Sequence, residues 1–257
     1  MNISFKNFLC RLFLVFLLSS AGIVRAEMAT IAIASNFGDV ARHLVEEFES
    51  TSDHDVTLVT GASGRFYAQI SNGAPFDAFL SADSEKPAEL IETGLALSDS
   101  VFTYAIGRLA LWSKDETLVQ DNVSTLSMNG SHKIAYANPR LAPYGKAASE
   151  VIKALSLLNV LEGKLVQGEN IAQTYQFVFT GNADLGFVAL SQILQGGTLG
   201  PGSAWVIPKS LHSPIRQNAV LLARARHNLA ANEFMRFLKM PASRSIIRSY
   251  GYETGDS

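Results

Sequence analysis

The sequence has almost no cysteine, little excess charge and no clustered histidines. Cys10 is the only cysteine of the 257 residues, and it lies in an N-terminal segment that we expect to be removed, so the mature protein would hold neither disulfides nor thiolate metal sites. The five histidines show no close metal-ligand spacing such as His-Glu-x-x-His. These absences argue against a disulfide-stabilised module and against a histidine metal centre.

A long membrane-spanning run is also absent. Lys6 and Arg11 precede an apolar stretch over residues 12–18, which is far shorter than the ~20 residues that a spanning helix needs. The segment Val24-Arg25-Ala26 then has the small residues expected before a cleavage site. We therefore predict a signal peptide over residues 1–26 and a mature, soluble, periplasmic chain that begins near Glu27. A buried core strand is the alternative interpretation of the apolar stretch.

Charge gives no sign of a nucleic-acid partner. Removal of residues 1–26 takes away Lys6, Arg11 and Arg25 and no acidic residue, which leaves 18 basic against 23 acidic residues. A mildly acidic chain with scattered charges lacks the basic surface of a nucleic-acid binder. The roughly 230 remaining residues suffice for two modest lobes.

Strand and helix patterns alternate along the mature chain. Apolar runs at 30–34, 56–59 and 78–80 predict strands, and they alternate with helical patterns around 40–48, at 65–71 and up to Gly94, which we expect in a left-handed helix cap. A second series has strands at 134–136, 164–166 and 185–188 with helices at 146–158 and 172–179. A loop at 196–202, strands at 205–207 and 218–222, and helices at 228–239 and 242–250 complete the chain. This rhythm is typical of α/β folds with parallel strands.

Two extended segments, 102–112 and 215–222, interrupt the rhythm. We expect them to join two α/β lobes, the first made of residues 27–106 and 215–257 and the second of residues 107–214. Ligands of such architectures lie in the cleft between the lobes. One large doubly wound domain is the alternative.

Catalytic motifs are incomplete. Gly61-Ala62-Ser63-Gly64 is similar to a nucleophile elbow, but Arg65 stands where that motif requires glycine. We therefore expect a binding protein and not an enzyme. An exported hydrolase that uses Ser63 stays as the alternative from another class, and an esterase assay would distinguish the two.

A strand followed by a short polar or glycine-containing turn and a helix start recurs four times. The four places are Ala34-Ser35-Asn36-Phe37-Gly38, Gly61-Ala62-Ser63-Gly64, Ala142-Pro143-Tyr144-Gly145 and Glu169-Asn170-Ile171-Ala172. Helix starts offer unpaired N–H groups and a partial positive charge, so several of them around one cleft would bind an anion. Ser35, Asn36 and Ser63 would add side-chain donors. Ordinary N-capping is the alternative, and Asp39 could belong to such an arrangement.

Over nearly its whole mature length the chain resembles the periplasmic molybdate-binding proteins of ABC importers. Several motifs carry the resemblance by their order and spacing: Ala34-Ser35-Asn36, Gly61-Ala62-Ser63-Gly64 before Gln69-Ile70, the stretch 72–83, Asn138-Pro139, Ala142-Pro143-Tyr144-Gly145, the stretch 185–192 and Tyr250-Gly251-Tyr252. The resemblance implies a type II periplasmic binding protein fold, in which each lobe is a mixed sheet flanked by helices and two strands cross between them.

The resemblance also implies the ligand and its contacts. Molybdate or tungstate would be held between the lobes by hydroxyls and backbone amides, without direct protein ligands to the metal and without a cofactor. The five positions that match are Ser35, Asn36, Ser63, Tyr144 and Ile171, the last two through their backbone N–H groups. The implied partner is the membrane permease of an ABC importer, and the protein is expected to be a monomer.

Two positions leave the ligand set open. Some family members have a tyrosine hydroxyl where this chain has Ala189, so either Asn36 and Tyr144 supply the missing donor or the ligand differs. Arg65 could reach the anion, although we expect it to lie along the lobe surface. Sulfate and phosphate remain alternative ligands. Ferric iron would need a cluster of anionic or tyrosine oxygens, which the neighbourhoods of Ser35, Ser63 and Ile171 do not offer.

Overall fold

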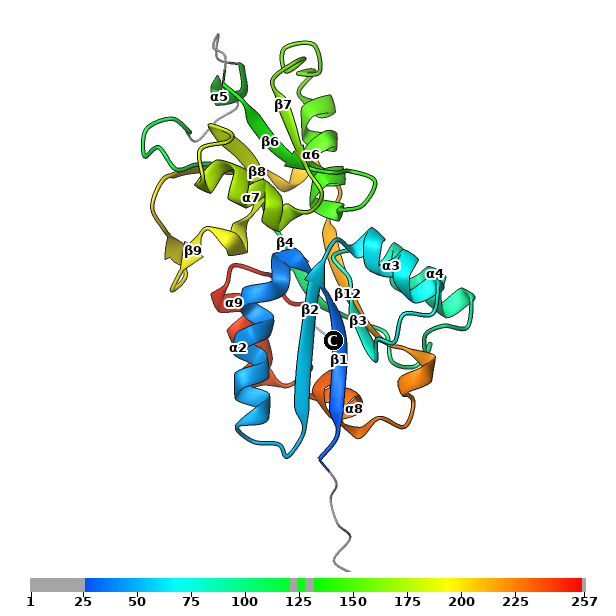
Figure 1. Cartoon of the computed structure of the whole chain (residues 1–257). Helices are drawn as coiled ribbons and strands as arrows, with labels where there is room; N and C mark the ends of the chain where they lie inside the picture. Colours follow the sequence, from blue (N-terminus) through cyan, green and yellow to red (C-terminus); the bar gives the residue numbers. More distant parts are fainter. Residues whose placement is uncertain (1–25, 121–123, 128–131, 256–257) are drawn as a thin grey trace, which may run out of the picture.

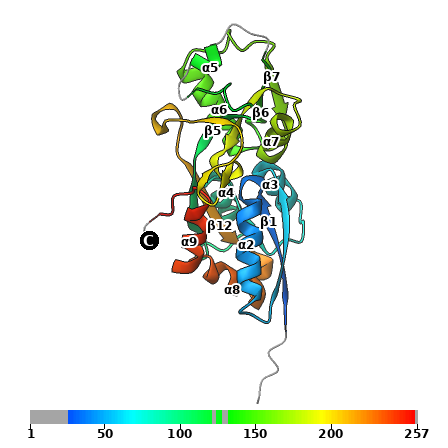
Figure 2. The same cartoon turned by 90° about the vertical axis from the view of Figure 1, so that its left-hand side faces the viewer.

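The computed structural model describes residues 26–120, 124–127 and 132–255. The expected signal peptide therefore lies outside the described residues except for Ala26. Two five-stranded sheets, each flanked by helices, form two lobes that lie one above the other (Figure 1). The view in Figure 2, turned by 90°, shows the same division. We call the lobe that contains β1 lobe 1 and the other lobe 2.

Lobe 1 contains the sheet β2-β1-β3-β12-β4. Its strands are β1 (Met28–Ala34), β2 (Asp55–Gly61), β3 (Ala78–Leu80), β4 (Phe102–Gly107) and β12 (Ile215–Leu221). β1 is parallel to β2 and β3, whereas β12 is antiparallel to β3 and β4. The sheet is therefore mixed.

Helices cover both faces of this sheet. Ile31 and Ile33 of β1 pack into a core with α2 (Gly38–Glu49), α8 (Leu229–Phe237) and α9 (Pro241–Ser249). Ala32 faces the opposite core, which includes residues of α3 (Ser63–Ser71) and α4 (Glu85–Glu92). Because successive strand residues face opposite sides and both sides are buried, β1 is apolar without interruption from Ile31 to Ala34.

Lobe 2 contains the sheet β11-β5-β8-β6-β7. Its strands are β5 (Leu109–Ser113), β6 (Ile134–Ala137), β7 (Leu165–Gly168), β8 (Leu185–Ala189) and β11 (Ser203–Val206). β6 is parallel to β7 and β8, and β5 is antiparallel to β8 and β11. Helix α6 (Pro143–Ala154) packs on one face through Val151, and α7 (Ile171–Phe179) packs on the other through Val178.

The chain crosses between the lobes twice. β4 continues into β5 with only Arg108 between them, and the return runs from β11 through the 3-10 turn η3 (Lys209–Leu211) into β12. The expected two-lobed architecture with two crossing segments is confirmed, and the single doubly wound domain is excluded. No helix in the described part of the chain combines the length and apolar character needed to cross a membrane.

Some boundaries differ from the sequence-based prediction. The helix expected at 146–158 is α6, Pro143–Ala154. Pro143 occupies its first turn, where the fixed φ of proline suits a helix start. The expected loop at 196–202 contains a small hairpin of β9 (Leu194–Gln195) and β10 (Thr198–Leu199).

Glycines at positive φ explain two of the local features. Gly196 and Gly197 form the turn of the β9–β10 hairpin with φ values of 58° and 83°, as a tight two-residue turn requires. Gly94 has a φ of 72° just after α4, which confirms the predicted left-handed position beyond that helix. The short helix α5 (Ser124–Ser127) was not predicted.

Candidate functional site

The strand registers bring the four predicted turns to one place. In lobe 1 the last residues of β1 and β2, Ala34 and Gly61, are paired, and in lobe 2 Ala137 of β6 pairs with Gly168 of β7. The turns that follow these parallel strands therefore lie at the carboxyl edges of the two sheets, where α/β proteins bind ligands. They meet around a small pocket between the lobes.

All five residues predicted from the sequence line this pocket. They are Ser35, Asn36, Ser63, Tyr144 and Ile171. The rest of the lining is Ala34, Gly61, Ala62, Ala82, Ala142, Pro143 and Asn170. None of these lining side chains carries a charge, so the site has no counter-ion for an anion and no carboxylate for a cation.

Side-chain capping does not account for most of the helix starts. The 3-10 turn η1 (Ser35–Phe37), α3 and α6 follow Ala34, Ala62 and Ala142, and none of the three has a side-chain cap. First-turn N–H groups have no acceptor within their own helix, so these starts leave donors at the pocket. The alternative that Ser35 or Asn36 merely caps a helix is therefore wrong for this turn.

The start of α7 is capped, but only in part. The Oδ1 of Asn170 accepts a hydrogen bond from the backbone N–H of Gln173 at 2.9 Å. The N–H of Ile171, at the first position of the helix, has no such partner among the residues that the structure describes. It remains as a donor on the lobe 2 side of the pocket.

The hydroxyl of Ser63 can donate a hydrogen bond to a ligand in the pocket. Its Oγ accepts a hydrogen bond from the N–H of Ala82 at 3.0 Å, and the residue is only 1% exposed. Since that bond uses a lone pair and not the proton, the O–H is left for an acceptor in the pocket. The hydroxyl of Ser35 makes no hydrogen bond to the described residues, so it too is available.

Asn36 and Tyr144 line the pocket, but their side chains have other partners. Asn36 Nδ2 donates to Gln217 Oε1 and to Tyr252 OH, both at 2.9 Å, which uses both of its protons. The Tyr144 hydroxyl accepts from Gln217 Nε2 at 3.2 Å. The side-chain donor expected at Asn36 is thus occupied, and what both residues can offer a ligand is the backbone N–H.

Ala189 lies at the end of β8, outside the pocket lining. Its N–H donates to Gln192 Oε1 at 2.9 Å, and Gln192 Nε2 donates to the carbonyl of Ile171 at 3.2 Å. Gln192 therefore holds the peptide that follows the pocket amide of Ile171. Sequence reasoning missed Gln192, and nothing in its pattern distinguishes it from a surface glutamine.

Three buried tyrosines lie beside the pocket and remain protonated. Burial raises the pKa of Tyr252 to about 12 and raises the pKa values of Tyr104 and Tyr144 well above the ordinary 10. Their hydroxyls therefore act as neutral hydrogen-bonding groups at any physiological pH. Gln217 stands between Arg216 and Asn218 in β12, so no local sequence pattern distinguishes it as a buried member of this group.

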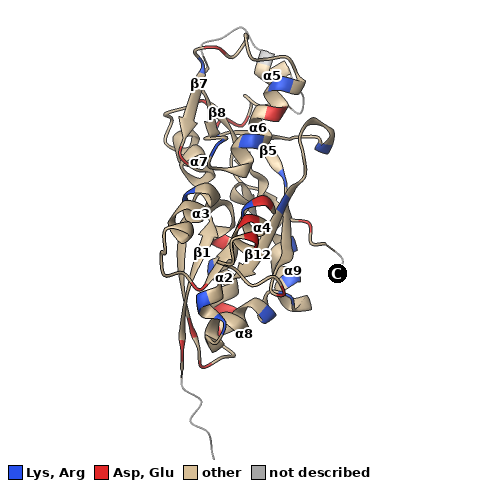
Figure 3. Cartoon of the chain, turned by 90° about the vertical axis from the view of Figure 1, so that its right-hand side faces the viewer, with Lys and Arg blue, Asp and Glu red and all other residues tan. Residues whose placement is uncertain are grey.

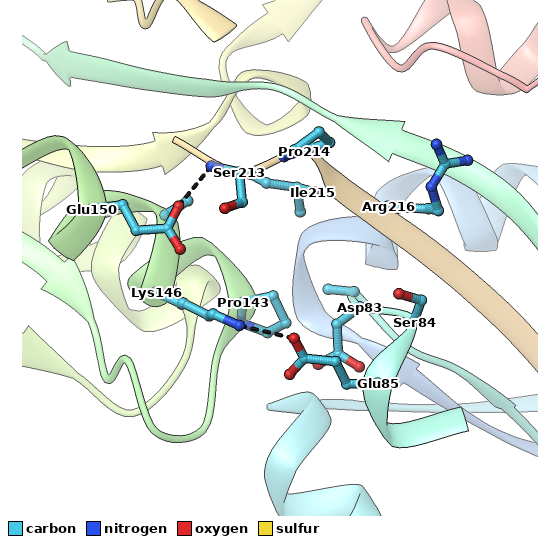
Figure 4. A pocket seen from close by; sticks show the side chains of 12 residues that line it. Asp83, Ser84, Glu85, Pro143, Lys146, Glu150, Ser213, Pro214, Ile215 and Arg216 are labelled. Atoms are coloured by element: carbon cyan, nitrogen blue, oxygen red, sulfur yellow. Dashed lines mark hydrogen bonds and ion pairs between the residues drawn. The ribbon is translucent and has the colours of Figure 1, made fainter. Parts of the chain in front are cut away.

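Two ion pairs and one backbone contact join the lobes around the pocket. Arg65 pairs with Glu169 at 3.0 Å, and Lys146 pairs with Glu85 at 2.9 Å, the latter shown in Figure 4. The N–H of Gly64 donates to the carbonyl of Leu141 at 2.9 Å. The lobes are thus in contact over the pocket.

Arg65 does not line the pocket. It extends across the cleft to Glu169, which differs from the expected course along one lobe. Elsewhere, basic and acidic residues are spread over both lobes, as Figure 3 shows for one side.

Comparisons with known proteins agree with this geometry. Residues 29–253 match the family model described as bacterial extracellular solute-binding protein. The chain is 43% identical to the molybdate-binding protein ModA of Azotobacter vinelandii over 228 residues, 89% of this chain and 90% of that protein. It is 46% identical to ModA of Rhodobacter capsulatus over 223 residues, 87% of each chain.

A solved structure shows the same fold. The periplasmic molybdate-binding protein of Azotobacter vinelandii superimposes with a TM-score of 0.86 at 39% identity, over 89% of this chain and 100% of that one. The resemblance and the fold expected from the sequence are both confirmed. The chain therefore belongs to the bacterial extracellular solute-binding proteins, a family of binding proteins and not of enzymes.

Proposed function

We propose that this protein captures molybdate or tungstate in the pocket between its lobes and delivers it to the membrane permease of an ABC importer. The observation that carries the proposal is the uncharged pocket, which both lobes line with hydrogen-bond donors. Relatives that are 43% and 46% identical over most of the chain are named molybdate-binding proteins, which supports the choice of ligand.

The donors suit a tetrahedral dianion. Lobe 1 offers the hydroxyls of Ser35 and Ser63 and the N–H groups of the same turns, and lobe 2 offers the N–H groups of Tyr144 and Ile171. Each hydrogen bond to a charged acceptor contributes ~1.5 to 3 kcal/mol, so a few of them can replace a counter-ion. Helix starts add partial positive charge from both sides.

A cation does not suit the same pocket. Divalent and ferric ions prefer carboxylate, tyrosinate or imidazole ligands, and the lining contains neither carboxylate nor histidine. Its one tyrosine, Tyr144, has a pKa raised well above 10 by burial and so keeps its proton. Iron is therefore a poor candidate.

A hydrolase is also poorly supported. Ser63 lies at the start of α3, but no histidine lines the pocket that could take its proton as a general base. Ser63 Oγ accepts from Ala82 instead of bonding to a base. Another oxyanion such as sulfate, which is also a dianion, is the better second candidate.

Export and delivery follow from the same proposal. The expected signal peptide would direct the chain to the periplasm, where the protein would act as a soluble monomer. The ligand would be enclosed by closure of the two lobes about the crossing segments, because donors from both lobes must reach one small anion. The permease would then have to favour the open form to take the ligand over.

Calorimetry of the mature chain, residues 27–257, with a panel of oxyanions tests the proposal. We expect molybdate and tungstate to bind with one site per chain. Sulfate and phosphate serve as the competing ligands. Tight sulfate binding without molybdate binding would assign the protein to another oxyanion, and the absence of heat with all four would reject the proposal.

A further inference from the structure

Behind the pocket lies a group of six buried polar side chains, which we call the polar network. Its members are Asn36, Tyr104, Tyr144, Ser191, Gln217 and Tyr252, none more than 7% exposed. Only Asn36 and Tyr144 also line the pocket. The network draws residues from lobe 1, from lobe 2 and from a strand that crosses between them.

Gln217 lies at the centre of the network. Its Oε1 accepts from Asn36 Nδ2 and from Tyr104 OH, both at 2.9 Å, and its Nε2 donates to Tyr144 OH at 3.2 Å. Gln217 belongs to β12, at the point where the pairing with β4 shifts register. One side chain thus connects a pocket residue of lobe 1 with a pocket residue of lobe 2.

Tyr252 holds the other side of Asn36. Its hydroxyl accepts from Asn36 Nδ2 at 2.9 Å and donates to the carbonyl of Asn36 at 2.8 Å. The Ser191 hydroxyl of lobe 2 lies 2.9 Å from the Tyr252 hydroxyl and 3.2 Å from the Asn36 carbonyl, and its one proton can be donated to either oxygen. The amide side chain and the carbonyl of Asn36 are therefore both fixed, and its backbone N–H, in the first turn of η1, has no acceptor within that turn.

Close packing leaves the network little room to adjust. Gly107, where β4 ends, lies directly against Tyr144 OH and Gln217 Nε2, so a Cβ there would overlap the Tyr144 hydroxyl. The ring of Phe37 packs edge-on against Tyr104 and Tyr252, with ring centres 4.7 Å and 5.4 Å apart. Buried hydrogen bonds in such surroundings are costly to break, because water cannot replace them.

We propose that Tyr252, Gln217 and Ser191 are positioning residues for the ligand: they hold the backbone amides of Asn36 and Tyr144 at a fixed separation, and so set both the affinity and the size selectivity of the pocket. The inference rests on the proposed function. Sulfate is smaller than molybdate, so it is rejected only if the amides cannot move inward. Because Ser191 and Tyr144 meet their partners across the lobe interface, the network is complete only when the lobes are closed.

The test replaces a hydroxyl and keeps the ring. Tyr252→Phe removes both bonds to Asn36 and retains the packing on Phe37. Tyr250→Phe is the matched control, since the Tyr250 hydroxyl contacts His43 at 3.4 Å and neither residue belongs to the network. Calorimetry with molybdate, competition with sulfate and the melting temperature without ligand are measured for both.

We expect Tyr252→Phe to weaken molybdate binding about tenfold, the equivalent of one hydrogen bond, and to weaken sulfate binding less. The molybdate-to-sulfate affinity ratio falls, and it does not change in Tyr250→Phe. A purely structural role would lower the melting temperature and leave this ratio unchanged, which would overturn the inference.

A milder variant covers the case in which Tyr252→Phe does not fold. Ser191→Ala removes one lobe 2 hydroxyl of the network and leaves that of Tyr144, and we expect a fall of about threefold in molybdate affinity, again with a lower ratio to sulfate. An unchanged ratio in Ser191→Ala contradicts the inference while leaving the proposed function intact. Wild-type protein that binds neither anion would reject the proposed function, and with it this inference.

Discussion

The two halves of the pocket provide their donors in different ways. Lobe 1 offers side-chain hydroxyls, Ser35 and Ser63, as well as backbone amides. Lobe 2 offers the backbone amides of Tyr144 and Ile171, whose side chains belong to the apolar cluster of that lobe. Ligand binding by lobe 1 therefore depends partly on which side chains are present, whereas ligand binding by lobe 2 depends on the conformation of its turns.

The largest loss of affinity is expected for a ligand that carries a proton, because neither half of the pocket has a carboxylate to accept a hydrogen bond from it. Molybdate, tungstate and sulfate are unprotonated dianions at neutral pH, whereas phosphate keeps at least one proton. No carboxylate lines either half of the pocket, and an unmade buried hydrogen bond costs ~1 to 3 kcal/mol or more beside a charge.

Competition calorimetry should therefore rank molybdate and tungstate together, sulfate much lower and phosphate last. Sulfate must be rejected by its size, which requires stiff amides on both sides. Sulfate that displaces molybdate at comparable concentration would contradict this, and tight phosphate binding would mean that an acceptor such as Asp39 or Glu169 reaches the ligand.

Ser63→Ala tests the side-chain half. The variant loses the hydroxyl donor, at ~1.5 to 3 kcal/mol for a bond to a charged group, and it leaves the N–H of Ala82 without its acceptor. We expect the free energy of molybdate binding to weaken by more kcal/mol than the free energy of unfolding decreases. Equal binding with a sharply lower melting temperature would show that Ser63 only supports the turn.

Ile171→Pro tests the backbone half, because proline removes the N–H and is tolerated at the first position of a helix. Asn170, with φ −149° and ψ 175°, already has the extended conformation that precedes proline. We expect a loss of about 1.5 kcal/mol in molybdate binding, the lower end for a bond to a charged acceptor.

Ile171→Ala is the control for this change, since it removes a buried side chain, keeps the N–H and should cost ~2 to 5 kcal/mol of stability. Its molybdate affinity should remain near that of the wild type. If the alanine variant loses as much affinity as the proline variant, side-chain packing and not the amide explains the loss.

The smallest effect on molybdate affinity is expected from a substitution in the exposed ion pair that joins the two halves of the pocket. Arg65 and Glu169 are both more than half exposed, so Arg65→Ala should change molybdate affinity by at most about 1 kcal/mol, and less at high salt. Titrations at low and high ionic strength check this. A much larger loss, independent of salt, would indicate that Arg65 reaches the bound anion.

Local sequence patterns predicted most of the fold and identified the four turns that line the pocket. Strand β1 and the turn at Pro143 are determined by residues that are adjacent in the chain, so the sequence alone predicts their backbone conformation. The boundaries of α6 were displaced, since a helix also ends where its packing against the sheet ends. The β9–β10 hairpin was missed, because strands of two residues have no measurable period.

Contacts across the cleft were not predictable in the same way. Arg65 and Glu169 are 104 positions apart, and Asn36 and Tyr252 are 216 apart. No local pattern marks such partners, so Asn36 was expected to offer its side chain to the ligand, and Arg65 was expected to lie along one lobe.

By itself, the sequence determined where backbone donors are exposed: helix starts preceded by Ala34, Ala62 and Ala142 have no side-chain cap, and this depends only on residues within one turn. The tertiary structure alone decided which side chains remain available to a ligand. The hydroxyl of Ser63 keeps its proton for the pocket because its fold partner is a donor, Ala82 N–H, whereas the amide of Asn36 is used by Gln217 and Tyr252. Each N–H or O–H proton serves one hydrogen bond at a time, and the tertiary fold determines which acceptor it meets.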